Sequence, residues 1–255
     1  MPYSQFLQTA IQAARAGEEI IRHYYRGDIG VRLKEDRTPV TVADIETEKA
    51  IKTILQTAYP EHGFYGEETG RNRTDAEYVW LVDPIDGTKS FVRQYPFFST
   101  QIALLKGERF IVGVSNAPLF GELAYAEAGG GACLNDQPLR VSAIQELSAA
   151  TLSFGNIKTL AAGRNWPALA ALIGQLNRTR GYGDFYHYHL LAAGKIEIVI
   201  ESDINILDVA ALSLLIQEAG GRVTDLQGRP LNLESTTILA SNGLLHDTVL
   251  ALLNR

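Results

Sequence analysis

Two carboxylates three residues apart, Asp83 and Asp86, follow an apolar segment at 78–82. The segment predicts a buried strand, and Pro84 predicts its end because proline lacks the N–H that a sheet ladder requires. Carboxylate oxygens are the ligands that Mg²⁺ prefers in proteins. We therefore expect a pair of candidate metal ligands where this strand ends.

The next two residues, Gly87 and Thr88, favour an anion beside such a metal. Gly87 lets the backbone approach a ligand closely, and Thr88 is a good N-cap for a following helix. The free N–H groups at a helix start attract an anion. A divalent cation can join carboxylates to a phosphate placed there, so the pattern favours phosphate chemistry, although Asp-Pro-x-Asp-Gly also suits an ordinary turn.

Two further acidic blocks favour the chemical interpretation over the turn. Glu67 and Glu68 follow the apolar segment at 63–65, and Asp208 lies near the start of an apolar helix predicted at 206–219. In this order and spacing the three blocks resemble the inositol monophosphatase family, magnesium-dependent and lithium-sensitive phosphatases, from about Thr9 to about Asn242.

The resemblance implies a role for each matching residue. It implies two or three Mg²⁺ ions, held by Glu67, Asp83, the backbone carbonyl of Ile85, Asp86 and Asp208. It implies that Glu67 and Thr88, backed by Asp44, orient and deprotonate the attacking water, and that the N–H groups of Gly87 and Thr88 bind the phosphate. Lys34 matches a lysine of the family's mobile metal-gating loop.

The residues expected to contact the alcohol part of the substrate favour one branch of the family. Asp184 and Glu201 lie 24 and seven residues before Asp208, and both positions match pocket contacts in the family. Two carboxylates favour an alcohol that carries an amine or imidazolium charge. The Gly183-Asp184-Phe185 block resembles the histidinol-phosphatase branch. The expected substrate contacts are Asp86, Gly87, Thr88, Asp184, Glu201 and Asp208, although Asp184 could instead cap a helix that starts at Phe185.

The leading hypothesis is thus a Mg²⁺-dependent phosphomonoesterase that hydrolyses L-histidinol phosphate in histidine biosynthesis. The alternatives are an inositol-1-phosphatase, a broad phosphatase of small sugar or polyol phosphates, and a catalytically silent metal-binding regulator. No Arg/Lys cluster that could hold a second substrate phosphate is evident in the sequence.

The composition and net charge of the chain exclude some classes of binding partner. A net charge of −6 and a pI near 5.4 argue against nucleic acid and anionic membranes, which both require a basic surface. Cys133 is the only cysteine, so no intrachain disulfide can form. No secretory signal or membrane-spanning run is visible, and we expect a cytoplasmic protein. The resemblance implies a homodimer.

The elements that must position these residues change in type along the chain. Apolar spacing predicts helices at 4–25 and 44–59 around a hairpin at 29–42, then antiparallel strands from 98 to 134. From residue 151 strands and helices alternate.

We expect a single domain of two intimate lobes, about 1–145 and 146–255. The resemblance implies an α+β fold with α-β-α-β-α layers. His187 and His189 are two apart on a predicted helix and face different directions, which predicts packing and surface roles instead of a zinc site.

Overall fold

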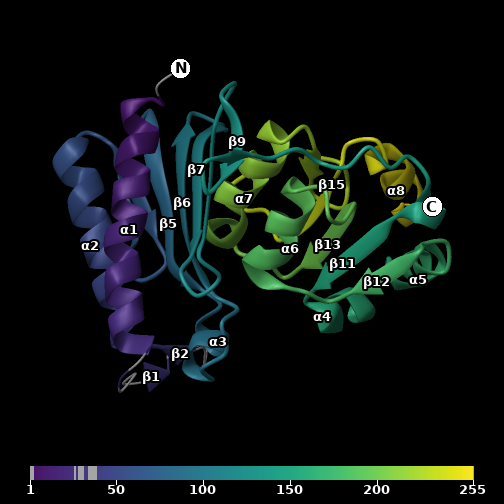
Figure 1. The fold of residues 1–255 in the computed structure, drawn as a ribbon, viewed down its shortest axis with the longest axis horizontal. Helices are drawn as coiled ribbons and strands as arrows, with labels where there is room; N and C mark the ends of the chain where they lie inside the picture. Colours follow the sequence, from purple (N-terminus) through teal and green to yellow (C-terminus); the bar gives the residue numbers. More distant parts are fainter. Residues whose placement is uncertain (1–2, 26, 28–31, 34–38, 255) are drawn as a thin grey trace.

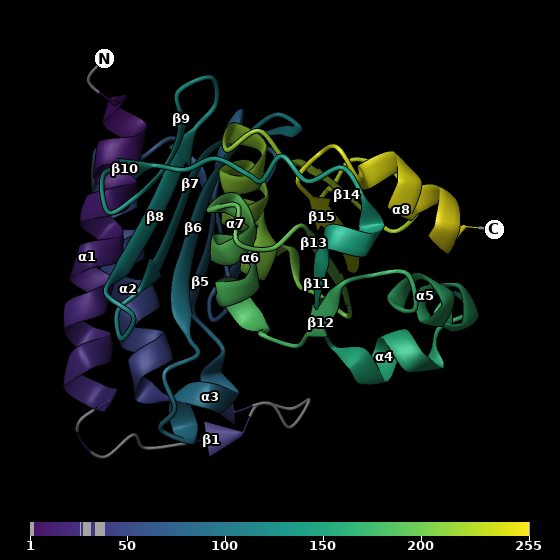
Figure 2. The same cartoon turned by 45° about the vertical axis from the view of Figure 1, so that its right-hand side comes forward.

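The computed structural model describes residues 3–25, 27, 32–33 and 39–254. Figure 1 shows five layers side by side: two long helices, a large sheet, two central helices, a smaller sheet and an outer group of helices. The turned view in Figure 2 shows the same succession of layers. The chain therefore has the predicted α+β fold with alternating layers.

The first layer consists of α1 (Gln5–Tyr25) and α2 (Val42–Ala58), which pack against each other and against the large sheet. Helix α2 begins two residues earlier than predicted because Thr41 and Asp44 form a capping box at its start. Between the helices, β1 (Arg32–Leu33) pairs antiparallel with β2 (Pro39–Val40). These strands confirm part of the predicted hairpin, while its Lys34 loop lies outside the described residues.

The large sheet has the strand order β10-β9-β8-β7-β6-β5-β3-β4. Its strands are β3 (Gly63–Gly66), β4 (Gly70–Asn72), β5 (Tyr78–Asp86), β6 (Ser99–Lys106), β7 (Arg109–Ala117), β8 (Glu122–Glu127), β9 (Gly131–Leu134) and β10 (Gln137–Pro138). The predicted antiparallel meander is present as β6 to β9. On β5, Trp80 and Val82 pack in the core under α1 and α2, whereas Val79 and Leu81 belong to the core on the opposite face.

The prediction that β5 ends before Asp83 is wrong, because the strand runs through Pro84 to Asp86. Asp83 pairs with Gln101 and Asp86 with Ser99, so the register shifts by one residue between them. This bulge accommodates a residue without an N–H donor. It also places both carboxylates at the very end of a paired and buried strand.

The second half of the chain forms the other three layers. The central helices are α6 (Asp184–Ala192) and α7 (Ile206–Glu218). The smaller sheet has the order β12-β11-β13-β15-β14, from β11 (Thr151–Gly155), β12 (Arg178–Arg180), β13 (Ile198–Ser202), β14 (Arg222–Thr224) and β15 (Thr237–Ser241). The outer helices are α4 (Ile157–Ala162), α5 (Trp166–Ile173) and α8 (His246–Leu253), and a 3-10 turn spans Leu147–Ala149.

Helix α7 is the centre of this arrangement. Its residues from Val209 to Ile216 are almost entirely buried, in a core that it shares with both sheets. This explains why the helix is apolar on all sides. Within the described part of the chain, no helix is both long enough and apolar enough to cross a membrane.

Candidate active site

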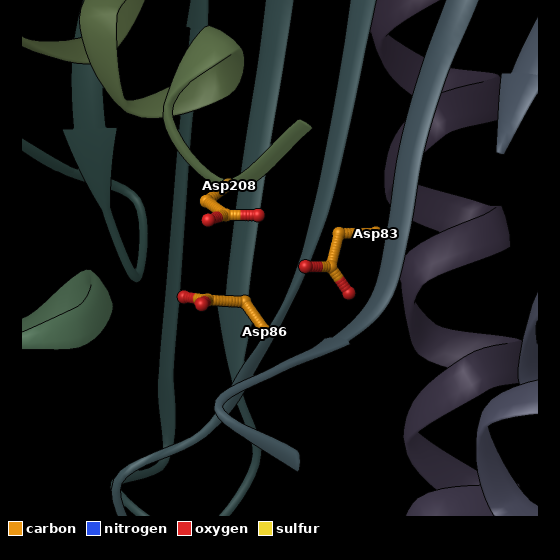
Figure 3. A group of neighbouring side chains, drawn as sticks. All are labelled: Asp83, Asp86 and Asp208. Atoms are coloured by element: carbon orange, nitrogen blue, oxygen red, sulfur yellow. The ribbon is translucent and has the colours of Figure 1, made fainter. Parts of the chain in front are cut away.

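Three carboxylates from two distant parts of the chain converge in one cleft. Asp83 and Asp86 come from the end of β5 and Asp208 from the first turn of α7, and Figure 3 shows all three turned toward a common space. One oxygen of each lies within 4.8 Å of the others. The cleft has a volume of about 740 Å³. This is the convergence that the sequence predicted for candidate metal ligands.

Burial and mutual repulsion act on these carboxylates together. Burial, with the nearby charges of Glu67 and Asp208, raises the pKa of Asp83 well above its usual range. Burial and the charge of Asp208 do the same to the pKa of Asp86. Burial and Glu67 raise the pKa of Asp208 to about 7. A site made of hard oxygen donors with excess negative charge fits a divalent cation such as Mg²⁺, which would relieve this repulsion.

Local hydrogen bonds hold two of the carboxylates in place. Asp83 accepts a hydrogen bond from the N–H of Ile85 at 2.9 Å. Asp208 is the third residue of α7 and accepts one from the N–H of Asn205 at 3.3 Å, in a capping box. Each carboxylate is thus fixed by the element that carries it.

The segment after Asp86 contains the predicted anion site. Helix α3 (Thr88–Val92) starts here, but its N-cap is Gly87, so the prediction of Thr88 as N-cap is wrong by one residue. Gly87 has φ of +90°, and a Cβ on it would lie 2.5 Å from the carbonyl oxygen of Phe97. Only glycine fits this turn without strain, and both Gly87 and Thr88 line the cleft.

Thr88 forms a hydrogen bond with Asp44, the residue that the family resemblance pairs with it. Its hydroxyl lies 3.1 Å from Oδ1 of Asp44 and 3.0 Å from the carbonyl oxygen of Ile85, two acceptors for one proton. The other oxygen of Asp44 accepts hydrogen bonds from the N–H and hydroxyl of Thr41. Burial is the main cause that raises the pKa of Asp44. Asp44 does not line the cleft itself, and its hydrogen bond with Thr88 links it to the cleft.

Glu67 lines the same cleft, on the loop that follows β3. Its N–H donates to the carbonyl oxygen of Val82, which ties the loop to β5. Glu48, a fully buried residue of α2, was not predicted from the sequence as part of this region. Its carboxylate accepts the N–H groups of Glu68 and Thr69 at 2.8 and 2.9 Å. Glu48 lies four residues after Asp44, on the same face of α2, and this spacing was the available signal.

A smaller pocket of about 90 Å³ continues from the cleft toward the second sheet. Asp184 and Glu201 line it together with Asp86 and Asp208. Asp184 is the first residue of α6, and the N-cap of this helix is Gly183. Burial and the charge of Glu201 raise the pKa of Asp184 to about 6. The structure thus places both predicted alcohol contacts beside Asp83, Asp86 and Asp208, which we call the metal-type cluster. The alternative that Asp184 caps a helix starting at Phe185 is wrong, because the helix already includes Asp184.

The prediction of surface positions for the histidines is wrong, since His187 and His189 are 0% and 2% exposed. His189 lies 2.7 Å from Oε2 of Glu122 and 2.9 Å from the hydroxyl of Ser115, so both ring nitrogens have partners. His187 faces the second sheet, where it contacts Ser153 and Glu201. Partners far away in the sequence stabilise both rings inside the core.

Comparison with known proteins places this site in a family. Residues 3–255 match the inositol monophosphatase family. The histidinol-phosphatase of Mycobacterium tuberculosis is 37% identical, over 97% of each chain. The inositol-1-monophosphatase of Rhizobium meliloti is 35% identical, over 95% of this chain and 93% of its own. The extragenic suppressor protein suhB of Bartonella henselae superposes with a TM-score of 0.90 at 30% identity, over 99% of each chain.

The fold and the converging carboxylates, with these likenesses, define a phosphatase that hydrolyses phosphate monoesters. The chain belongs to the inositol monophosphatase family. That family is metal-dependent and typically uses Mg²⁺, in agreement with the donor set of this cleft.

Proposed function

We propose that this phosphatase is a Mg²⁺-dependent histidinol-phosphatase, which converts L-histidinol phosphate and water to L-histidinol and phosphate. The observation that carries the proposal is the pair Asp184 and Glu201, which lines a small pocket directly beside the metal-type cluster. The similarity to the histidinol-phosphatase of M. tuberculosis supports it.

In this proposal Glu67, Asp83, Asp86, Asp208 and the carbonyl oxygen of Ile85 would hold two or three Mg²⁺ ions. The ions would neutralise the phosphate, lower the pKa of a water and stabilise the departing alkoxide. Thr88 orients the attacking water through its hydroxyl, because Asp44 and the Ile85 carbonyl fix the direction of that hydroxyl. Glu67, which lines the same cleft, takes the water's proton, which then passes to the departing alkoxide.

Asp86, Gly87 and Thr88 line the part of the cleft where the phosphate would bind. The alcohol extends toward Asp184 and Glu201, where its amine or imidazolium pairs with the carboxylates. The division near residue 145 then separates the phosphate side from the alcohol side, with Asp208 as the exception. The homodimer, the cytoplasmic location and the place in histidine biosynthesis stay predictions.

The test compares kcat/KM for L-histidinol phosphate and for inositol-1-phosphate, in the wild type and in Asp184→Asn. We expect the wild type to prefer histidinol phosphate, and the variant to lose about tenfold or more on that substrate only, as expected for a buried charge pair. Asp203→Asn is the matched control, because Asp203 is an exposed carboxylate that lines the same cleft. A variant that loses nothing on histidinol phosphate contradicts the proposal.

A second candidate is an inositol-1-phosphatase, which the similarity to the R. meliloti enzyme favours. A neutral polyol gains no charge pair from Asp184, so this candidate predicts equal losses on both substrates or none. The same comparison of kcat/KM therefore distinguishes the two functions.

A further inference from the structure

The position of Glu201 depends on a neighbouring glycine. In the parallel pair β11 and β13, Gly155 lies opposite Glu201. A Cβ on Gly155 would lie 1.9 Å from Oε1 of Glu201 and 2.2 Å from its Cδ. The carboxylate therefore occupies space that exists only because residue 155 has no side chain.

Helix α6 supplies a hydrogen-bond donor to this carboxylate. The hydroxyl of Tyr188 donates to Oε2 of Glu201 at 2.8 Å. Tyr188 is 1% exposed, and burial together with the charge of Glu201 raises its pKa well above the usual range. The tyrosine thus remains protonated and donates to Glu201 at any physiological pH.

His187, also on α6, approaches the same oxygen from a second direction. Its Nδ1 lies 3.1 Å from the hydroxyl of Ser153, and that hydroxyl oxygen already accepts the N–H of Tyr182 at 3.2 Å. The serine is therefore free to donate its own proton to Nδ1, which leaves the histidine proton on Nε2.

The Nε2 of His187 lies 3.3 Å from Oε2 of Glu201. It is fully buried, and among the described residues it makes no hydrogen bond of good geometry. A buried N–H without an acceptor is costly, and Glu201 can accept it after a small rotation of the carboxylate.

We propose that His187 and Tyr188 are specificity-determining positioning residues, which hold the Glu201 carboxylate toward a cationic alcohol, and that Ser153 supports them by fixing the His187 tautomer. The inference deepens the proposed function and rests on it. His187 lines neither the cleft nor the smaller pocket, so it acts through Glu201. Tyr188 lines the smaller pocket beside Glu201, and its hydroxyl is directed to the Glu201 carboxylate.

The first experiment measures the ratio of kcat/KM for L-histidinol phosphate to that for inositol-1-phosphate. In His187→Asn the amide replaces Nδ1 and the donor near Glu201 is lost, whereas in His187→Gln it replaces Nε2 and the donor is kept. We expect the ratio to fall about tenfold in His187→Asn and in Tyr188→Phe, and to stay within about threefold in His187→Gln. Tyr188→Phe removes a hydrogen bond to Glu201, His187→Asn removes the second donor near the same oxygen, and His187→Gln keeps that donor.

His189→Asn is the matched control, because His189 is on the same helix and as deeply buried but contacts Glu122 and Ser115. We expect it to lower both kcat/KM values equally. A His187→Asn variant that behaves in the same way, with an unchanged ratio, overturns the inference. Should His187→Asn not fold, Tyr188→Phe and Ser153→Ala give the same ratio, and an unchanged ratio in both also overturns it.

A second measurement does not depend on the substrate. The ¹⁵N shifts of the His187 ring, assigned by their loss in His187→Gln, should show the proton on Nε2 in the wild type and a mixture of tautomers in Ser153→Ala. A proton on Nδ1 in the wild type contradicts the inference even if the enzyme prefers histidinol phosphate. A wild type without that preference, but with the proton on Nε2, rejects the proposed function and leaves the positioning of Glu201 supported.

Discussion

Two groups of carboxylates lie at the two ends of the space formed by the cleft and the smaller pocket that continues from it, and their surroundings differ. Asp83, Asp86 and Asp208 lie within 4.8 Å of one another, and burial with repulsion raises their pKa values. At the other end, Glu201 accepts a hydrogen bond from Tyr188. A cation from outside the protein would relieve the repulsion in the first group, whereas in the second group a hydrogen bond from the protein already supports Glu201.

This difference suits the two groups to different cations. A crowded group with few donors gains most from a small divalent ion, which has the charge density to overcome the repulsion. A carboxylate that accepts a hydrogen bond from a neutral donor can still pair with a larger, weaker cation such as an ammonium or imidazolium. The comparison predicts metal dependence at one end and substrate selectivity at the other.

Loss of a carboxylate at the crowded end should have the largest effect. We expect Asp83→Asn and Asp86→Asn each to lower kcat/KM with Mg²⁺ by about a thousandfold, because transition-state charge then goes uncompensated. Steady-state phosphate release measures this. Asp75→Asn, at an exposed carboxylate outside the cleft, is the control and should behave like the wild type. A loss below tenfold in both variants would remove the distinction between the two ends.

The water-orienting hydroxyl comes next. We expect Thr88→Ala to lower kcat roughly a hundredfold with little change in KM, since a positioned proton-transfer partner contributes about that much. Thr88→Ser keeps the hydroxyl that contacts Asp44 and should retain most of the activity. Equal kcat values for Thr88→Ala and Thr88→Ser would show that the hydroxyl has no part in the reaction.

The stability of the metal-free protein should depend on pH through Asp208. Its pKa is about 7 in the fold and 3.8 as the ordinary value, so between these pH values the folded protein binds the extra proton. The contribution of Asp208 to the free energy of unfolding is therefore largest below pH 4, and it falls as the pH rises to 7. We expect Asp208→Asn to remove about 1 to 2 kcal/mol of this fall.

Urea unfolding in chelator at pH 5 and pH 8 measures this pH dependence. In Asp208→Asn the new side chain can still accept a hydrogen bond from the N–H of Asn205. Loss of the helix cap therefore does not account for a changed pH dependence. An equal pH dependence in the wild type and Asp208→Asn would contradict the repulsion inferred at the crowded end.

The smallest effect is expected at Glu48, which holds the loop of Glu67 through two backbone N–H groups. Glu48→Gln keeps one acceptor oxygen and should cost about 1 kcal/mol of stability, with a few-fold loss of kcat/KM. Thermal unfolding and kinetics measure the two quantities. A stability loss with unchanged kinetics would show that the loop position does not depend on Glu48.

The sequence predicted the parts of this molecule that depend on local pattern. The apolar spacing in α1 and the acidic blocks around Asp83 and Asp208 are visible without a partner strand or helix. The continuation of β5 through Pro84 was not visible, because it depends on the register opposite Gln101 and Ser99. The short helices α4 and α8 also carry too few residues for a clear periodicity.

The same limit applies to the site. Asp184 and Glu201 were predicted as contacts by resemblance, but their support was not, since Gly155 and Tyr188 reach Glu201 only through sheet pairing and helix packing. The buried state of His187 likewise depends on Ser153, which lies 34 residues away. Contacts between distant segments decide these features, and no local pattern encodes them.

The central claim is that the converging carboxylates bind Mg²⁺. Isothermal titration calorimetry of the metal-free protein with MgCl₂ in the presence of inorganic phosphate tests this claim most directly. We predict saturable Mg²⁺ binding in the wild type that weakens by about a hundredfold in Asp83→Asn and Asp86→Asn, because the carboxylates are the main ligands. Asp184→Asn should bind Mg²⁺ like the wild type. No binding in the wild type, or equal binding in Asp83→Asn and Asp86→Asn, would contradict the account.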